Sequence, residues 1–76
     1  MSPTMTMPAL DLTVNGATEA LSVATVSDLL DAKGIDAARK GIAVARNGAV
    51  VPRRAWTDTR LASGDTLEII TAKQGG

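Results

Sequence analysis

The sequence contains no cysteine and no histidine among its 76 residues. It therefore lacks a thiol nucleophile, the usual zinc ligands and the one side chain that titrates near neutral pH without perturbation. These absences exclude stand-alone catalysis by Ser-His, Cys-His or zinc chemistry. Asp and Glu are scattered along the chain, and a domain of this size has little room to desolvate one of them as a catalytic acid or base. We therefore expect neither an enzyme nor a metal site.

Aromatic residues and charge imbalance are also lacking. Trp56 is the only aromatic residue, which argues against a base-stacking surface for nucleic acid. Lys and Arg together number 8, as do Asp and Glu, so no net charge attracts nucleic acid or an anionic membrane. No apolar run approaches the roughly 18 residues that a membrane-spanning helix needs. The absence of cysteine fits a reducing compartment and fits the lack of any redox constraint equally well. We expect a cytoplasmic protein.

The length predicts one small domain, which buries only about 60% of its unfolded surface and so has a thin core. Residues 1–8 have neither the basic nor the apolar region of a secretory signal, and we interpret them as a flexible N-terminal tail. The domain is predicted to span residues 9–71. Residues 72–76 are predicted to form a flexible C-terminal tail that ends in Gly-Gly.

The first part of the domain has the pattern of a hairpin. Hydrophobic and polar residues alternate over residues 10–14, and Leu21 and Val23 alternate with the small residues Ala20 and Ser22, which is the period of strands with one buried face. Between these segments, Asn15-Gly16 is the pair that best tolerates the positive φ angles of a type I′ turn.

The period changes after residue 25, where three hydrophobic residues fall on one face of a helix: Val26, Leu29 and Leu30. Thr25 is the predicted N-cap, and Asp28 places negative charge in the first turn. Gly34 suits the left-handed position that ends a helix, with Ile35 folding back on the last turn. Residues 36–40 fit either a helical turn or a loop.

A second hairpin is predicted from residues 42–46 and 49–51, which flank Asn47-Gly48. Residues 53–63 form a long connection, which Trp56 and Leu61 attach to the core. Gly64-Asp65 then turns into a last strand, 66–70. The pattern predicts an α+β domain with one helix packed on a mixed sheet of four to five strands.

The ending of the chain is its most distinctive chemical feature. Without a Cβ, Gly75 and Gly76 can lie extended in a channel too narrow for any side chain and deliver a carboxylate to a buried reaction centre. In a chain that lacks both Cys and His, the Gly76 carboxylate is the reactive element that we predict. Gly75 and Gln74 would give it access to the active site of another protein.

Four pieces of sequence occur together: Asn15-Gly16; Val44-Ala45-Arg46-Asn47-Gly48 with Val51-Pro52-Arg53 and Trp56; Leu61-Ala62-Ser63-Gly64-Asp65 with Leu67-Glu68-Ile69; and Gln74-Gly75-Gly76. With these pieces the chain resembles, from Leu10 onwards, the sulfur carrier proteins of thiamine thiazole biosynthesis, which are ubiquitin-like proteins with a β-grasp fold. The combination of Val-Pro-Arg-x-x-Trp with Gly-Gly is the most specific part. Lys73 departs from the family, whose members often have an apolar residue there.

The resemblance implies a carrier whose chemistry happens at Gly76. A partner related to ubiquitin-activating enzymes would use Mg-ATP to adenylate the carboxylate, and the carrier itself would bind no cofactor. A sulfur donor such as a cysteine desulfurase would then supply the sulfur of a C-terminal thiocarboxylate. Thiazole synthase would accept that sulfur.

Docking to these partners has several candidate residues. If Leu67 and Ile69 face the helix, Ile70 lies on the opposite face of the sheet, where we expect it to form an apolar docking patch with Val51. Arg53 is a candidate for contact with an acidic partner surface, or a solvated residue. Trp56 is either an interface anchor or, as we favour, a loop residue attached to the core.

Three other functions use the same fold. A ubiquitin-like modifier needs the same Gly-Gly and the same adenylation, but forms isopeptide bonds with target lysines. A carrier of the molybdopterin synthase type differs in its acceptor, and its tail typically carries Pro-Pro-Val where this chain has residues 71–74. In a plain interaction module, Gly75 and Gly76 would be dispensable.

Overall fold

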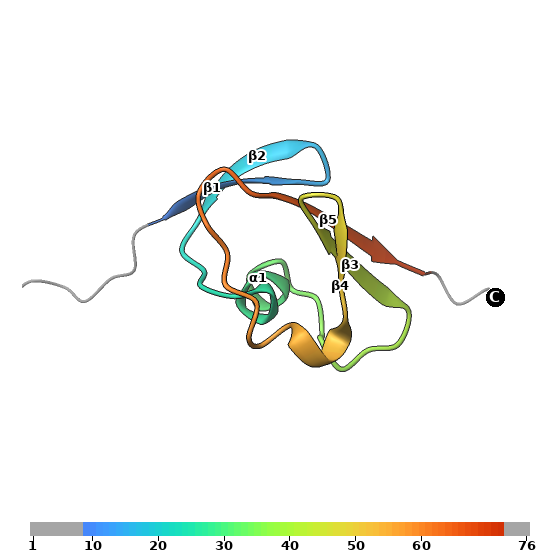
Figure 1. Cartoon of the computed structure of the whole chain (residues 1–76). Coiled ribbons are helices and arrows are strands. Elements are labelled where there is room, and N and C mark those ends of the chain that lie inside the picture. The colour runs from blue at the N-terminus through green and yellow to red at the C-terminus, as the bar shows by residue number, and fades with distance from the viewer. Residues whose placement is uncertain (1–8, 73–76) are drawn as a thin grey trace, which may run out of the picture.

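Five strands form one mixed sheet in the computed structural model, which describes residues 9–72 (Figure 1). They are β1 (Leu10–Val14), β2 (Ala17–Leu21), β3 (Ile42–Arg46), β4 (Ala49–Val51) and β5 (Thr66–Thr71). The order across the sheet is β2-β1-β5-β3-β4. The neighbours β1 and β5 run parallel, whereas the other pairs are antiparallel. The predicted mixed sheet is therefore confirmed, with the last strand at its centre.

Both predicted hairpins are present, and each turns at an Asn-Gly pair, but the return strand of the first, β2, covers Ala17–Leu21 rather than the predicted residues 20–23. Asn15 and Gly16 have φ angles of 50° and 86°, and Asn47 and Gly48 have angles of 51° and 85°. Positive φ at both central residues is the geometry of a type I′ turn, whose twist matches that of the flanking strands. These turns set the register of β1 with β2 and of β3 with β4.

Helix α1 (Val26–Ala32) begins and ends as the sequence predicts. The Thr25 hydroxyl accepts a hydrogen bond from the Asp28 N–H, and the Asp28 carboxylate accepts one from the Thr25 N–H, which completes a capping box. At the other end, Gly34 has a φ of 74° and the Ile35 N–H donates to the Leu30 carbonyl over 2.8 Å. This is the Schellman arrangement.

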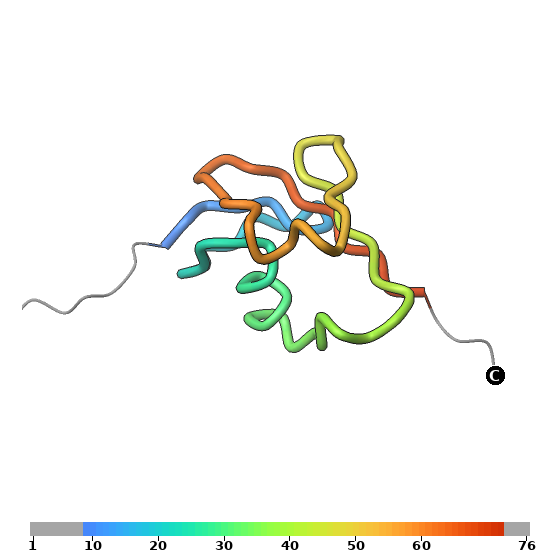
Figure 2. Tube along the Cα trace, turned by 60° about the horizontal axis from the view of Figure 1, so that its bottom comes forward, coloured from blue at the N-terminus to red at the C-terminus, as the bar shows by residue number. Residues whose placement is uncertain are grey.

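The core lies between α1 and one face of the sheet, and both views place the helix on a single side of it (Figures 1 and 2). Six of its side chains are fully buried: Leu12, Val26, Leu29, Leu30, Val44 and Leu67. Burying a side chain of this size contributes about 1.5–3 kcal/mol. The predicted helix-facing positions of Leu67 and Ile69 are confirmed.

The connections contain one more short element, the 3₁₀-helix η1 (Arg53–Ala55). The ambiguous residues 36–40 form a loop rather than a helical turn, because the Asp36 side chain accepts a hydrogen bond from the Ala38 N–H and so shapes the backbone into a tight turn. Leu61 is buried as predicted. Within residues 9–72, no helix is long and apolar enough to cross a membrane.

Candidate functional site

The candidate site begins where β5 leaves the sheet. Thr71 is still paired with Ile42 of β3, and the Ala72 N–H then donates a hydrogen bond of 2.7 Å to the carbonyl of Gly41. The strand runs toward the end of the molecule that lies opposite the start of β1 (Figure 1). Gln74, Gly75 and Gly76 follow in the sequence but lie outside the described residues, so their predicted roles stay predictions.

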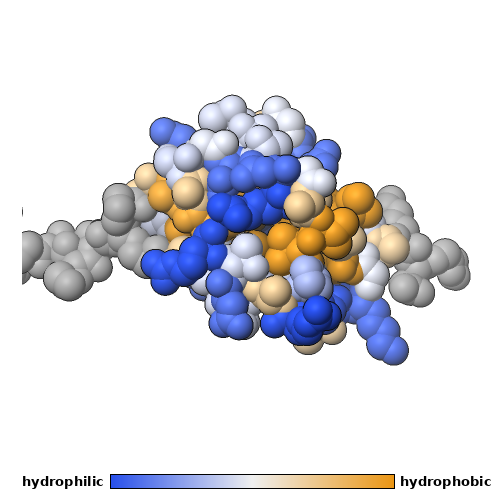
Figure 3. All heavy atoms as spheres, in the orientation of Figure 1, coloured by the Kyte–Doolittle hydropathy of each residue, from blue (hydrophilic) through white to orange (hydrophobic). Residues whose placement is uncertain are grey.

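The outer face of the sheet carries two large hydrophobic residues close to this point. Ile70 is 64% exposed and pairs with Ala43, while Val50 is 77% exposed and pairs with Ala45. We call these four residues the outer-face patch. A space-filling view shows hydrophobic residues reaching the surface on the side of the molecule where β3, β4 and β5 lie (Figure 3). The prediction that Ile70 faces away from the helix is confirmed.

Val51 does not belong to this patch, so that part of the prediction is wrong. Val51 is only 9% exposed and pairs with Val44, whose side chain lies in the core. Because successive side chains of a strand point to opposite faces, the neighbour of Val51 must point outward. The exposed valine of β4 is therefore Val50, which the alternation would have identified if the register with Val44 had been known.

Trp56 is attached to the core, as the favoured interpretation predicts. It is 3% exposed, and its indole N–H donates a hydrogen bond of 2.9 Å to the Val51 carbonyl. That bond satisfies the polar end of an otherwise apolar ring. The spacing of Val51 and Trp56 in the Val-Pro-Arg-x-x-Trp motif therefore allows a hydrogen bond that spans η1 and joins the residues on either side of it.

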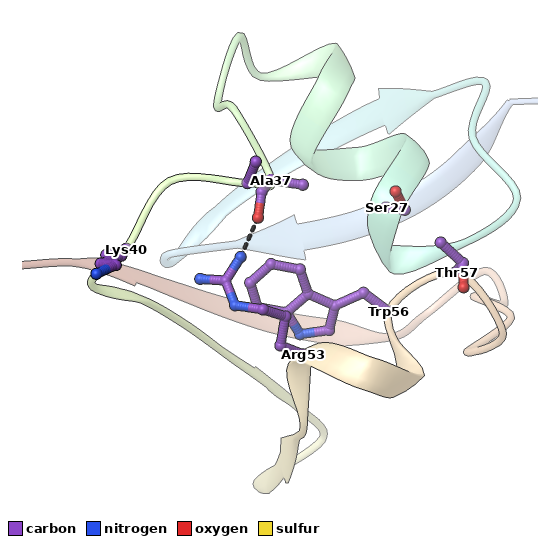
Figure 4. A pocket seen from close by; sticks show the side chains of 7 residues that line it. Ser27, Ala37, Lys40, Arg53, Trp56 and Thr57 are labelled. Carbon is purple, nitrogen blue, oxygen red and sulfur yellow. Dashed lines mark hydrogen bonds between the residues drawn. The ribbon is translucent and has the colours of Figure 1, made fainter.

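Arg53 is exposed, but its guanidinium contacts the protein itself. It lies 4.5 Å from the centre of the Trp56 ring, which is a cation–π distance. The same group donates hydrogen bonds to the carbonyls of Ala37 and Arg39, the latter over 2.7 Å. Figure 4 shows Arg53 beside the indole and pointing toward Ala37. Arg53 thus links η1 to the loop 36–40.

These groups border an open hollow of about 520 Å³ between the start of α1, the loop 36–40 and η1 (Figure 4). Its lining residues include Ser27, Ala37, Lys40, Arg53, Trp56 and Thr57. No group of three or more Asp and Glu residues within residues 9–72 could hold a metal ion.

Among the described residues, Asp65 is the one charged residue that is buried, and the sequence predicts only a turn at this position. Its carboxylate accepts hydrogen bonds from the Arg46 guanidinium (2.8 Å), the Asn47 side-chain amide (3.1 Å) and the Ala62 N–H (2.9 Å). Burial acts to raise the pKa of Asp65, but the three hydrogen bonds and the charge of Arg46 together lower it. Arg46 is therefore held in an ion pair.

This arrangement defines a class of protein. A mixed sheet with two parallel central strands, one helix across a single face and a last strand that leads out of the sheet is the β-grasp fold of ubiquitin-like proteins. Within that class, residues 8–76 match the ThiS family. The chain belongs to the ThiS family, as the resemblance in the sequence predicts.

Two solved structures of a thiamine biosynthesis protein from Geobacter metallireducens are similar to this chain. The crystal structure, of the protein named ThiS, has 33% sequence identity and a TM-score of 0.71, and the match covers 88% of this chain and 100% of that one. The solution NMR structure has 33% identity and a TM-score of 0.73, with 88% of each chain covered. A search of curated proteins found no match.

Proposed function

We propose that this chain is a sulfur carrier of thiamine biosynthesis and that the Gly76 carboxylate is the group that carries the sulfur. The observation that supports this most strongly is the family match, which extends through residue 76 and so includes the Gly-Gly ending. The β-grasp fold and the 33% identity to proteins of thiamine biosynthesis support the same function.

The first step of the proposed mechanism activates the carboxylate. A carboxylate resists nucleophilic attack because its charge is delocalised and oxide is a poor leaving group. An activating enzyme related to those of ubiquitin therefore joins the Gly76 oxygen to the α-phosphorus of Mg-ATP and releases pyrophosphate. The resulting acyl adenylate carries AMP, which is a good leaving group.

The second step introduces sulfur. The terminal sulfur of a persulfide, formed by a donor such as a cysteine desulfurase, attacks the acyl carbon and AMP leaves. A second thiol then attacks the inner sulfur of the acyl disulfide, which is the cysteine sulfur of the donor. This releases the thiocarboxylate and leaves a disulfide between the donor cysteine and the second thiol. Because this chain contains no Cys, every thiol in the sequence of steps belongs to a partner. The anionic thiocarboxylate sulfur then passes to thiazole synthase.

The carrier contributes recognition and reach, and the outer-face patch is the surface that we assign to partner docking. Ile70 of β5 lies two residues before Ala72, where the tail begins, and we call Ala72 the tail root. A partner that covers Ile70 and Val50 therefore lies beside the tail root. An exposed apolar area next to a reactive tail is a natural contact for an enzyme that must bind the carrier before it acts on Gly76. Arg53 has no such freedom, since it is bonded to the loop 36–40. The cytoplasmic location stays a prediction.

The acceptor of the sulfur distinguishes the proposal from its alternatives. The chain is incubated with activating enzyme, Mg-ATP and a donor of labelled sulfur, and then with thiazole synthase and its substrates. Label in the thiazole product supports the proposal. Label that passes only to a molybdopterin precursor supports the molybdopterin-type carrier, whereas conjugates to lysines of other proteins support the modifier. Either of these two results contradicts the proposed function.

A further inference from the structure

We propose that Gly41 and Arg53 are positioning residues, which together set the place where the tail leaves the sheet. This inference deepens the proposed function and rests on it. It assigns a role to the Val-Pro-Arg-x-x-Trp motif, whose residues neither carry sulfur nor lie in the outer-face patch. The motif holds a loop, and the end of that loop holds the root of the tail.

Gly41 makes the direct contact with the tail root. Its carbonyl accepts the 2.7 Å hydrogen bond from the Ala72 N–H, beyond the last strand pair of β3 and β5. Its φ is +83°, in the left-handed region that glycine adopts without strain. A Cβ at this position would lie 3.2 Å from the Ala72 Cβ, closer than side chains normally pack. Gly41 is therefore fitted to Ala72 both in its backbone conformation and in the absence of a side chain.

This close fit distinguishes Gly41 from the other glycines of the described chain. Gly16, Gly34, Gly48 and Gly64 also have positive φ, but a Cβ on any of them would meet no atom within 4 Å. Turn or helix-stop geometry accounts for those four positions. At Gly41 the neighbouring atoms belong to the last described residue of the chain, Ala72, which joins the domain to the proposed reactive end.

Arg53 fixes Gly41 from the other side through the loop 36–40. Its guanidinium binds the carbonyls of Ala37 and Arg39, the second of which lies two residues before Gly41. The arginine is itself held against the ring of Trp56, and that ring is bonded to the Val51 carbonyl. A continuous path of contacts therefore runs from β4 through the motif to the tail root.

We call this path of contacts, from Trp56 through Arg53 and the loop 36–40 to Gly41, the brace. It matters because residues 73–76 are all that lies between Ala72 and the end of the chain, a span of at most about 14 Å. With so short a tail, a displacement of Ala72 also displaces the positions that the Gly76 carboxylate can reach. Misplacement of a reacting group by about 1 Å can reduce a reaction rate 100-fold. Docking through Ile70 and Val50 would be unaffected, so the brace should influence the rate of adenylation and not the affinity.

The first test replaces Gly41→Ala in the full chain, with Gly34→Ala as the matched control. Both changes place a side chain at positive φ, but only the first introduces a contact with Ala72. In Gly41→Ala, we expect hydrogen exchange of the Ala72 amide, followed by NMR, to become about tenfold faster, which corresponds to a loss of about 1.4 kcal/mol in its protection. The single-turnover rate of adenylation at saturation should fall by a similar factor, with Kd for the activating enzyme unchanged.

A second substitution tests whether the contact itself is responsible. Ala72→Gly in the Gly41→Ala background removes the Cβ that the new side chain meets, and we expect it to restore most of the adenylation rate. Arg53→Met removes the guanidinium at the other end of the brace and should also slow adenylation at unchanged Kd. Its control is Arg54→Met, since no hydrogen bond or ion pair of Arg54 occurs within residues 9–72.

The outcomes separate this inference from the proposed function. Faster exchange and slower adenylation in Gly41→Ala and Arg53→Met, with rescue by Ala72→Gly, support the brace. Unchanged Ala72 exchange, an unchanged adenylation rate, or an equal effect of Gly34→Ala overturns it. A wild-type chain that is never adenylated refutes the proposed function, and the exchange of Ala72 then decides by itself whether Gly41 holds the tail root.

Discussion

Asp65 shows how one buried carboxylate can join distant parts of a small domain. It receives hydrogen bonds from Arg46 and Asn47, which lie 19 and 18 residues earlier in the chain, and from Ala62 in its own turn. The second hairpin is thereby fastened to the start of β5. The sequence predicts the turn at this position, but the burial of Asp65 depends on residues that only the folded chain brings together.

The lowered pKa of Asp65 predicts acid sensitivity. Because the folded protein holds the proton less tightly than the unfolded chain, the stabilisation is complete above the ordinary value of 3.8 and is lost as the pH falls through the lowered value. We expect the free energy of unfolding in urea to decline below about pH 4 for this reason. Asp65→Asn should be about 1–3 kcal/mol less stable at neutral pH and show a weaker acid dependence. An acid dependence equal to that of the wild type would contradict this role, and Asp58→Asn, at an exposed position, is the control.

Asn15 has a second role that its turn does not require. Its side-chain oxygen accepts from the Ile69 N–H over 2.8 Å, and its amide donates to the Ile69 carbonyl over 3.2 Å. The direct pairing of β1 with β5 ends at Val14 and Leu67, so the Asn15 side chain continues the ladder beyond the last strand pair. Asn47 acts similarly on the Thr66 N–H.

Asn15→Gly separates these two roles, since glycine keeps the positive φ but removes both side-chain hydrogen bonds. We expect a loss of about 1–2 kcal/mol in the free energy of unfolding. Thr18→Ala, on the exposed part of β2, should change it by less than about 0.5 kcal/mol. If Asn15→Gly is as stable as the wild type by urea unfolding, turn geometry alone explains the asparagine.

Helix α1 is the element that the sequence predicts most completely. Its cap, its apolar face and its stop are each set by residues no more than five positions apart in the sequence, and each is in the predicted position. Thr25→Ala removes the hydroxyl that accepts from the Asp28 N–H, and we expect a loss of about 1 kcal/mol. Thermal or urea unfolding would measure it, and Thr25→Ser, which keeps the hydroxyl, should retain most of the stability.

The sheet shows where prediction from sequence stops. Alternation along β5 correctly predicts that Ile70 faces outward, because this requires only local periodicity. The choice between Val50 and Val51 requires the register of β4 with β3, in which Val51 pairs with Val44. Adjacent valines carry no local signal for that register. The outer-face patch could therefore be predicted in part, and its second large residue could not.

The outer-face patch gives a prediction for docking. Ile70→Asp places a charge in the centre of the proposed contact, and we expect the affinity for the activating enzyme to fall at least about tenfold, or 1.4 kcal/mol. Val50→Asp should act in the same direction. Thr18→Asp, on β2 at the far edge of the sheet, is the control for added charge. Calorimetric titration measures the affinity, and near-wild-type binding by a folded Ile70→Asp variant would remove this surface from the account.

At the scale of the whole molecule, the two faces of the sheet and the end of the last strand have different roles. One face of the sheet is occupied by α1 and the core, the other presents Ile70 and Val50, and the last strand leads out beside Gly41. The Gly-Gly ending and the family were accessible from the sequence, because they depend on residues read in order. The brace was not, since Gly41 and Ala72 lie 31 residues apart and meet only in the fold.

The central claim is that the Gly76 carboxylate becomes a thiocarboxylate, and the intact mass of the protein measures this directly. The chain is incubated with activating enzyme, Mg-ATP and a sulfur donor, beside a variant that lacks Gly76. The account predicts a gain equal to the replacement of one oxygen by sulfur in the full chain, dependent on Mg-ATP and absent from the variant. An unchanged mass in the presence of an active partner, or the same gain without Gly76, would contradict it.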